Sequence, residues 1–176
     1  VIINDLTIQN GRGNDYIGVA KGGAISVFES SVILNNVRMY DSYTSQAMYQ
    51  GSGTVYCSDA SIIINSCLIQ NNYSRNSPGV VLWNSDIDIS NTIISGGETL
   101  YGDGGYNGMA IAINDAPNPF SIKNCTFIDN QESTTGADGI LRHLASVNVD
   151  NSVGIIENCL FWTDSLFIDS LSSVIV

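Results

Sequence analysis

The sequence is poor in basic residues and has no long apolar run, and each scarcity excludes a class of protein. Six Lys and Arg stand against seventeen Asp and Glu, which gives a formal net charge of −11. Phosphate binding needs a basic stripe, so we expect no nucleic-acid partner. No segment reaches the roughly 18 consecutive apolar residues of a membrane-spanning helix, so we expect no transmembrane segment. The 176 residues are nevertheless 44% apolar, which excludes a disordered chain.

A short motif returns six times along the chain. It reads apolar, any residue, small polar (usually Asn), apolar, any residue, apolar. Its copies begin at Ile3, Leu34, Ile64, Ile89, Ile122 and Ile156. The starts lie 31, 30, 25, 33 and 34 residues apart. A period in this range, without a helical pattern, indicates a stacked solenoid.

Each repeat also holds a β-type segment, opened by glycine, ahead of the next motif. The segments span residues 23–27, 53–57, 79–83, 108–113 and 139–143. We expect them to form a third strand in each coil, because glycine marks a turn before a short β-type run. One predicted inward column holds Ile25, Val55, Val81, Ile111 and Leu141, and the next holds Val27, Cys57, Trp83, Ile113 and His143.

Together these patterns predict one all-β domain over residues 1–176. We expect a right-handed, single-stranded parallel β-helix of about five to six coils of 25–34 residues, with three short strands in each coil. Parallel coils would stack about 4.8 Å apart. Because neither terminus carries a polar cap, we expect the chain to be a segment of a longer protein with caps or flanking modules missing.

The small polar position of the motif is expected to form a bend between two strands. Its residues are Asp5, Asn36, Ser66, Asn91, Asn124 and Asn158. Asparagine tolerates the left-handed backbone conformation of tight bends, and stacked asparagine side chains can hydrogen-bond along the column. We therefore interpret these residues as a structural asparagine ladder.

The ladder, the three-strand coil and the glycine-opened third strand resemble the parallel β-helices of the pectin-lyase-like superfamily over the whole chain. Gly22-Gly23-Ala24-Ile25 and Phe127-Ile128-Asp129-Asn130 are also similar to the GGAI and FxxN repeats of polymorphic outer-membrane proteins and related surface adhesins. Enzymes of the superfamily act on polysaccharides with paired carboxylates, or with Ca²⁺ and a basic residue. Here Asp41 and Asp129 are predicted three coils apart, roughly 14 Å, too far for a glycosidase pair.

The remaining candidates for metal binding and covalent chemistry are few. Asp86, Asp88 and Asp103 are weak candidates for Ca²⁺ ligands, while solvated turn carboxylates are the simpler interpretation. All four cysteines are predicted at inward positions as buried thiols. Cys125 and Cys159 share a column on adjacent coils, within the Cα range of a disulfide but with unfavourable parallel-strand geometry, so a disulfide between them is an alternative if the protein is secreted. Asn72-Tyr73-Ser74 and Asn124-Cys125-Thr126 match the glycosylation sequon. Asn72 is a candidate for a glycan, whereas Asn124 belongs to the ladder and is expected to be shielded.

Two surface features have no structural task in this scheme. The first is a set of tyrosines in loops that leave the coil at one corner: Tyr16, Tyr43, Tyr49, Tyr73, Tyr101 and Tyr106. Loops on one edge of a solenoid often bind a partner, although these rings could instead pack over their own loops. The second is an outward column containing Ile2, Ile33, Ile63 and Ile155, and exposed apolar strips often mark contact surfaces.

We therefore expect a non-catalytic structural or adhesive segment of an extracellular or cell-surface protein. Its partners would be a glycan or a surface protein at the tyrosine-rich edge, and further copies of the chain at the isoleucine strip. No cofactor is expected apart from the weak Ca²⁺ candidates. The alternative is a fragment of a polysaccharide lyase or glycoside hydrolase whose catalytic residues lie elsewhere.

Overall fold

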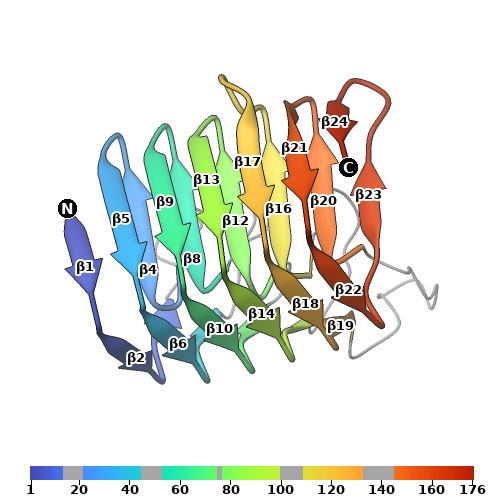
Figure 1. The fold of residues 1–176 in the computed structure, drawn as a ribbon. Helices are drawn as coiled ribbons and strands as arrows, with labels where there is room; N and C mark the ends of the chain where they lie inside the picture. The colour runs from blue at the N-terminus through green and yellow to red at the C-terminus, as the bar shows by residue number, and fades with distance from the viewer. Residues whose placement is uncertain (14–21, 45–52, 75–76, 100–108, 133–144) are drawn as a thin grey trace.

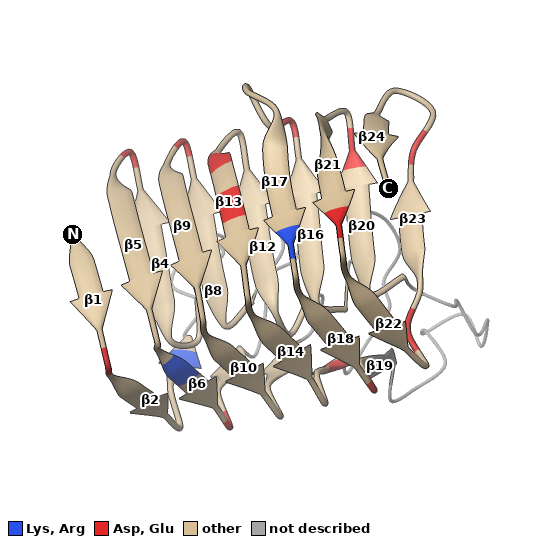
Figure 2. Ribbon diagram, in the orientation of Figure 1, with Lys and Arg blue, Asp and Glu red and all other residues tan. Residues whose placement is uncertain are grey.

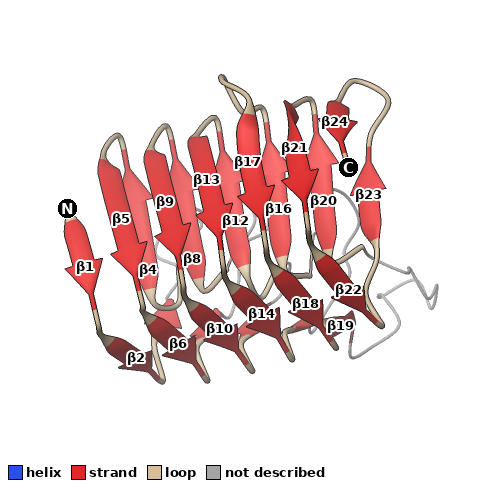
Figure 3. Ribbon diagram, viewed as in Figure 1, coloured by secondary structure: helices blue, strands red, loops and turns tan. Residues whose placement is uncertain are grey.

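The computed structural model describes residues 1–13, 22–44, 53–74, 77–99, 109–132 and 145–176. Within these ranges every regular element is a β-strand, and every strand pair is parallel (Figures 1 and 3). None of the described segments forms a helix that is long and apolar enough to cross a membrane.

The strands belong to four sheets, here named A to D. Sheet A contains β1 (Ile2–Asn4), β5 (Ser31–Asn35), β9 (Ser61–Asn65), β13 (Asp86–Ser90), β17 (Phe120–Lys123), β21 (Val153–Glu157) and β24 (Ser173–Ile175). Sheet B contains β2 (Thr7–Gln9), β6 (Arg38–Tyr40), β10 (Leu68–Gln70), β14 (Ile93–Ser95), β18 (Thr126–Ile128) and β22 (Leu160–Trp162). Sheet C contains β3 (Arg12–Gly13), β7 (Tyr43–Thr44), β11 (Tyr73–Ser74), β15 (Glu98–Thr99) and β19 (Gln131–Glu132). Sheet D contains β4 (Ile25–Phe28), β8 (Val55–Ser58), β12 (Val80–Trp83), β16 (Ile111–Asn114), β20 (Val147–Asp150) and β23 (Leu166–Ile168).

The chain passes through the sheets in the order D, A, B, C and then repeats, so each strand pairs with the strand one coil away (Figure 1). One such pass is called a coil below. All-parallel sheets built from successive coils are consistent with the predicted parallel β-solenoid. The predicted number of strands per coil was wrong, because the two-residue strands of sheet C make four instead of three. Such short strands carry no detectable alternation.

Three corners of the coil are made by residues in the left-handed conformation. At the A–B corner, φ lies between 52° and 56° at Asp5, Asn36, Ser66, Asn91, Asn124 and Asn158. The B–C corner has Asn10, Asp41, Asn71, Gly96, Asp129 and Thr163, and the D–A corner has Glu29, Asp59, Asn84, Asp115 and Asn151. Asn and Asp predominate because their short polar side chains tolerate this conformation. The predicted bend column is thereby confirmed.

Stacked side chains join the corners of neighbouring coils. Asn36 Nδ2 donates to Asp5 Oδ1 at 2.7 Å, and Asn91 Nδ2 donates to Asn65 Oδ1 at 2.9 Å. The ladder side chains themselves are exposed, including that of Asn124. Their hydrogen bonds therefore run along the surface of the stack, where they align one coil with the next.

The core is a set of inward apolar columns in register across the coils. In sheet A the pairing Leu34 to Ile64 to Ile89 continues to Ile122 and Ile156, all of them buried. In sheet B the column ends in Phe127 and Phe161, whose rings stack with centroids 4.9 Å apart. Like side chains in register bury a continuous core that no single coil could form.

The predictions that Val81 and Trp83 point inward from the third strand were wrong. The inward residues of β12 are Val80 and Leu82, which pair with Val55 and Cys57 of the preceding coil. Val81 instead packs on the outer face of sheet D with Tyr56 and Ala112. In the following coils the column continues through Ile111 to Val147. Leu141 and His143, which were predicted there, lie outside the described residues.

The last coil is shorter than the others. No sheet C strand follows β22 among the described residues, and β23 of sheet D begins four residues later. Asp164 lies in this short connection, where its carboxylate accepts hydrogen bonds from the backbone N–H of Asn130 at 3.0 Å and from Asn130 Nδ2 at 2.7 Å. Both carboxylate oxygens of Asp164 therefore accept hydrogen bonds from Asn130 in the preceding coil.

Candidate functional site

Two of the predicted tyrosines are brought together on sheet C. Tyr43 and Tyr73 are register partners on the adjacent strands β7 and β11. Arg12 pairs with Tyr43 on one side, and Glu98 pairs with Tyr73 on the other. We call these four residues the sheet C strip. They form one outward row across four coils, with a positive charge at one end, a negative charge at the other and two phenol rings between.

The ring faces of the strip are available to different extents. Tyr73 is 39% exposed, and Tyr43 is half-buried. The Arg12 guanidinium carbon lies 6.0 Å from the centroid of the Tyr43 ring, at the limit of a cation–π contact. Arg12 thus limits access to one side of Tyr43, while Tyr73 offers the more open ring.

The backbone beneath the strip is held by buried polar residues. Asn72 is 2% exposed, its Oδ1 accepts from the backbone N–H of Ser42 at 2.9 Å, and its Nδ2 donates to the carbonyl of Met39 at 3.3 Å. Asn130 repeats this arrangement two coils further, accepting from the N–H of Gly97 at 3.1 Å. The strip therefore stands on a fixed frame. The sequence did not reveal this inner column because it carries Ser, Asn and Gly in place of an apolar pattern.

The buried position of Asn72 bears directly on the sequon. Its amide nitrogen and oxygen are both engaged with neighbouring backbone, so in the folded chain it is not presented at the surface. Asn124, the other sequon asparagine, is exposed at the A–B corner instead. The structure thus reverses the accessibility predicted for these two residues. Tyr16, Tyr49, Tyr101 and Tyr106 lie outside the described residues.

The isoleucine strip is in register along the outer face of sheet A. Ile2 pairs with Ile33, which pairs with Ile63, and Ile155 pairs with Ile175 at the other end of the sheet. Exposures are 64% for Ile2 and 37% for both Ile63 and Ile155, while Ile33 is half-buried. Asp88 and Ser121 interrupt the column between the two apolar runs. An exposed apolar column therefore exists where the sequence predicted it.

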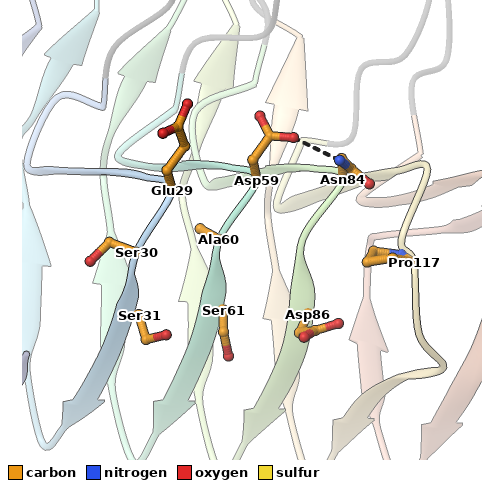
Figure 4. Close-up of a pocket in the computed structure, with 9 residues that line it drawn as sticks. All are labelled: Glu29, Ser30, Ser31, Asp59, Ala60, Ser61, Asn84, Asp86 and Pro117. Carbon is orange, nitrogen blue, oxygen red and sulfur yellow. Dashed lines mark hydrogen bonds between the residues drawn. The ribbon is translucent and has the colours of Figure 1, made fainter.

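The weak Ca²⁺ candidates divide between a groove and the open sheet face. Asp86 lines a groove of about 440 Å³ at the D–A corner together with Glu29, Asp59 and Asn84 (Figure 4). Asn84 Nδ2 donates to Asp59 Oδ1 at 2.6 Å, and Asn118 Nδ2 donates to Asp86 Oδ1 at 2.8 Å. These carboxylates are thus paired with amides of neighbouring coils.

Neither location assembles a metal site. Asp88 is exposed on sheet A, and Asp103 lies outside the described residues. Within the described ranges, no three His, Cys, Asp or Glu side chains gather as metal ligands would.

A pair of carboxylates, Asp150 at the end of β20 and Asp169 directly after β23, joins the D–A corners of two successive coils. Burial, the hydrogen bond with Asp169 and the charges of Asp169 and Asp115 raise the pKa of Asp150 to about 6. Hydrogen bonds from Ser172 and Asp150 lower the pKa of Asp169. Figure 2 shows acidic residues along this corner from coil to coil. Below about pH 6 the pair therefore holds a proton, because two close carboxylates resist ionising together.

The cysteines are all free thiols, three of them buried and Cys159 half-buried. Cys125 and Cys159 occupy the same inward column on adjacent coils, and the backbone N–H of Leu160 donates to the carbonyl of Cys125 at 2.9 Å. Cys67 is separated from this pair by Thr92, whose Oγ1 accepts from the backbone N–H of Cys67 at 3.2 Å. The structure thus groups two of the four thiols.

The two carboxylates considered for polysaccharide cleavage are too far apart to act as a glycosidase pair. Asp41 and Asp129 are in the same B–C corner column, with Asn71 and Gly96 between them, so their backbones are about 14 Å apart at one coil per 4.8 Å. Glycosidase carboxylates lie within about 9.5 Å of each other.

No protein-family model, no curated protein and no solved structure matches the chain. A function must therefore be argued from the chain's own surfaces. Of these, the sheet C strip combines aromatic rings, both charges and a fixed backbone.

Proposed function

We propose that the chain is a right-handed parallel β-helix segment of the pectin-lyase-like class, with a non-catalytic structural and adhesive role in an extracellular or cell-surface protein. The stack of coils would act as a rigid spacer, and the sheet C strip would contact a glycan. The observation that carries the proposal is the register pairing of Tyr43 with Tyr73 between Arg12 and Glu98. The wide separation of Asp41 and Asp129 supports the absence of catalysis.

A glycan fits the strip better than a nucleic acid or a polyanion. Tyrosine presents an apolar ring face to a sugar and a hydroxyl to its polar edge, and it loses little conformational entropy on binding. The net charge of −11 repels polyanions, so an uncharged glycan is the favoured class. Strip residues recur about every 4.8 Å along the stack, which would let successive sugars of an extended chain meet successive coils.

The experiment is a binding screen of the whole chain on immobilised neutral and acidic polysaccharides. Replacing Tyr43 and Tyr73 by Ala should weaken binding to the selected glycan by about two- to tenfold per ring, since an aromatic contact contributes roughly 0.5–1.5 kcal/mol. Tyr40→Ala is the matched control, because Tyr40 lies on the neighbouring sheet B, outside the strip. Equal binding by the double variant and the native chain would remove the strip from the proposal.

The same samples test the alternative of a polysaccharide lyase or glycoside hydrolase. Release of unsaturated or reducing ends from any polysaccharide of the panel would show catalysis and would overturn the non-catalytic role. Retention of the glycan with no released ends is the expected outcome.

Self-association through the isoleucine strip is the second part of the proposed role. The strip is flanked by a polar column in which Asn35 Nδ2 donates to Asn4 Oδ1 at 2.9 Å, and Lys123 Nζ lies 3.2 Å from Glu157 Oε2. An apolar row inside a polar border resembles the centre of a protein interface. Light scattering over a range of concentrations should show a dimer or larger assembly that Ile63→Lys disperses. A native chain that stays monomeric at high concentration would refute this part.

A further inference from the structure

Cys125 and Cys159 are distinguished from the other two thiols by their position on adjacent coils. They are consecutive members of one inward column, each directly before one of the register partners Thr126 and Leu160. Cys125 Sγ also lies 3.2 Å from the carbonyl of Lys123, and Cys159 Sγ lies 3.4 Å from that of Glu157. The two side chains therefore take the same orientation relative to their own coils, one above the other.

From this juxtaposition we infer that Cys125 and Cys159 form a thiol–disulfide exchange site that reacts with a low-molecular-weight disulfide such as oxidised glutathione. Coils in parallel register place paired Cα atoms about 4.8 Å apart, inside the range of roughly 4.4–6.8 Å that a disulfide spans. The inference does not depend on the glycan-binding role.

The two thiols have different tasks in the reaction. Cys159 is half-buried and Cys125 is buried, so only Cys159 meets a reagent from solvent. The neighbouring Cys125 thiol lowers the pKa of Cys159 to about 7, against the opposing effect of burial. The proximity of Cys159 and burial raise the pKa of Cys125. Cys159 is therefore the attacking thiolate at neutral pH, since the thiolate is the nucleophile.

The exchange proceeds in two balanced steps. The Cys159 thiolate attacks one sulfur of oxidised glutathione, forms a mixed disulfide and releases one glutathione thiolate. Cys125 then loses its proton to solvent and attacks the Cys159 sulfur, which forms the Cys125–Cys159 bond and releases the second glutathione. Two protein thiols are oxidised and one glutathione disulfide is reduced to two thiols.

The other cysteines provide internal controls. Burial raises the pKa of Cys57 to about 12, and burial also raises the pKa of Cys67. Thr92 occupies the column position between Cys67 and Cys125. Neither Cys57 nor Cys67 is expected to react in the folded chain.

The test equilibrates the reduced, folded chain with excess oxidised glutathione at pH 7.5, followed by acid quenching, alkylation and mass spectrometry of the peptides. The native chain should lose two of its four alkylatable thiols and yield a Cys125–Cys159 linked peptide. Cys125→Ser should stop at one glutathione adduct on Cys159, because the second thiol is absent. Cys159→Ser should form neither product. Cys57→Ser combined with Cys67→Ser should behave like the native chain.

A second measurement keeps the inference testable if a serine variant misfolds. In the native chain, the rate of alkylation of Cys159 should rise with a midpoint near pH 7, while Cys57 and Cys67 stay unlabelled until denaturant is added. Four unreacted thiols in excess oxidised glutathione would overturn the inference. So would a stable glutathione adduct without the linked peptide, or a bridge that includes Cys57 or Cys67.

Discussion

Gly154 packs directly against the ring of Phe120, which leaves no room for a side chain at position 154. The two residues are register partners in sheet A, at a column position where other coils carry Val32, Ile62 and Ile87. A Cβ atom added to Gly154 would lie 2.4 Å from both Cγ and Cδ1 of the Phe120 ring. The ring is 1% exposed, so it has no free space into which to turn. The Phe120 ring therefore fills the space that a side chain at position 154 would occupy.

Gly154→Ala should destabilise the chain by about 3 kcal/mol, the upper part of the usual range for overpacking a core. Phe120→Val should cost about 2–3 kcal/mol, since it is less severe than the roughly 3–5 kcal/mol of a Phe to Ala change. In the Phe120→Val background, Gly154→Ala should instead be neutral or stabilise by about 0.5–1 kcal/mol, because alanine suits a strand better than glycine. The coupling energy would then be at least about 3 kcal/mol.

The assay is urea unfolding at equilibrium of the native chain, the two single variants and the double variant, followed by circular dichroism. Ser121→Ala in place of Phe120→Val is the matched control, because Ser121 is the outward neighbour of Phe120 on β17 and should add independently to Gly154→Ala. If Gly154→Ala costs the same in both backgrounds, the ring does not occupy the space above Gly154, and the volume argument fails.

Three further changes test the corners and the shared column. Asp150→Asn should stabilise the chain at pH 7 but lose this advantage near pH 4. The raised pKa of Asp150 contributes stability that is present below about pH 3.8 and is lost as the pH rises through about 6. Melting temperatures of both chains against pH measure the difference, and an advantage that is constant with pH would contradict it. Asn36→Gly should cost less than Asn36→Ala, by about 1 kcal/mol in urea unfolding, since φ is 52° there; the reverse order would contradict the left-handed corner. Phe161→Leu should lower the free energy of unfolding by about 1 kcal/mol through loss of the stacked ring on Phe127, and no change would refute that contact.

The strands of sheets A and B could be predicted because the sequence marks both their inward residues and their ends. An apolar alternation leads into a left-handed corner at a fixed position, so Asn36 or Asn91 marks both the end of one strand and the start of the next. One outer face of each sheet meets solvent, which preserves the period of two. The order of the isoleucine strip followed directly from that register.

Sheet D could not be predicted as well, because both faces of its middle strands are buried. Val80, Val81 and Leu82 are all 1% exposed or less, so the apolar pattern of β12 does not say which side chains point inward. A strand buried on both faces is a continuous apolar run without alternation. The register of β12 was therefore placed one residue too far along, at Val81 in place of Val80. For β20, two apolar segments could be the sheet D strand: residues 139–143 and the segment that contains Val147. Counting back from the corner at Asn151 would have selected the second.

The residue type of the candidate site, tyrosine, was predicted from the sequence, but the pairing of its residues across strands was not. Composition alone identified tyrosines in the segments between the second and third strands. It could not show that Tyr43 and Tyr73 begin short strands of a fourth sheet, because a two-residue strand has no periodicity. The partners Arg12 and Glu98 were missed for the same reason, since only the pairing register places them beside the rings.

The varying length of the coil has a consequence for how such a chain can change. Residues stacked one coil apart differ by as few as 25 positions at Asp59 and Asn84, and by as many as 36 at Asp115 and Asn151, yet both pairs form the same amide–carboxylate hydrogen bond. Most of this difference falls between the sheet C strand of one coil and the sheet D strand of the next. Doubling a connection there costs only about 0.6 kcal/mol in closure entropy. Foreign peptides could therefore be grafted at this one edge, coil by coil, without shifting the ladder that aligns the stack.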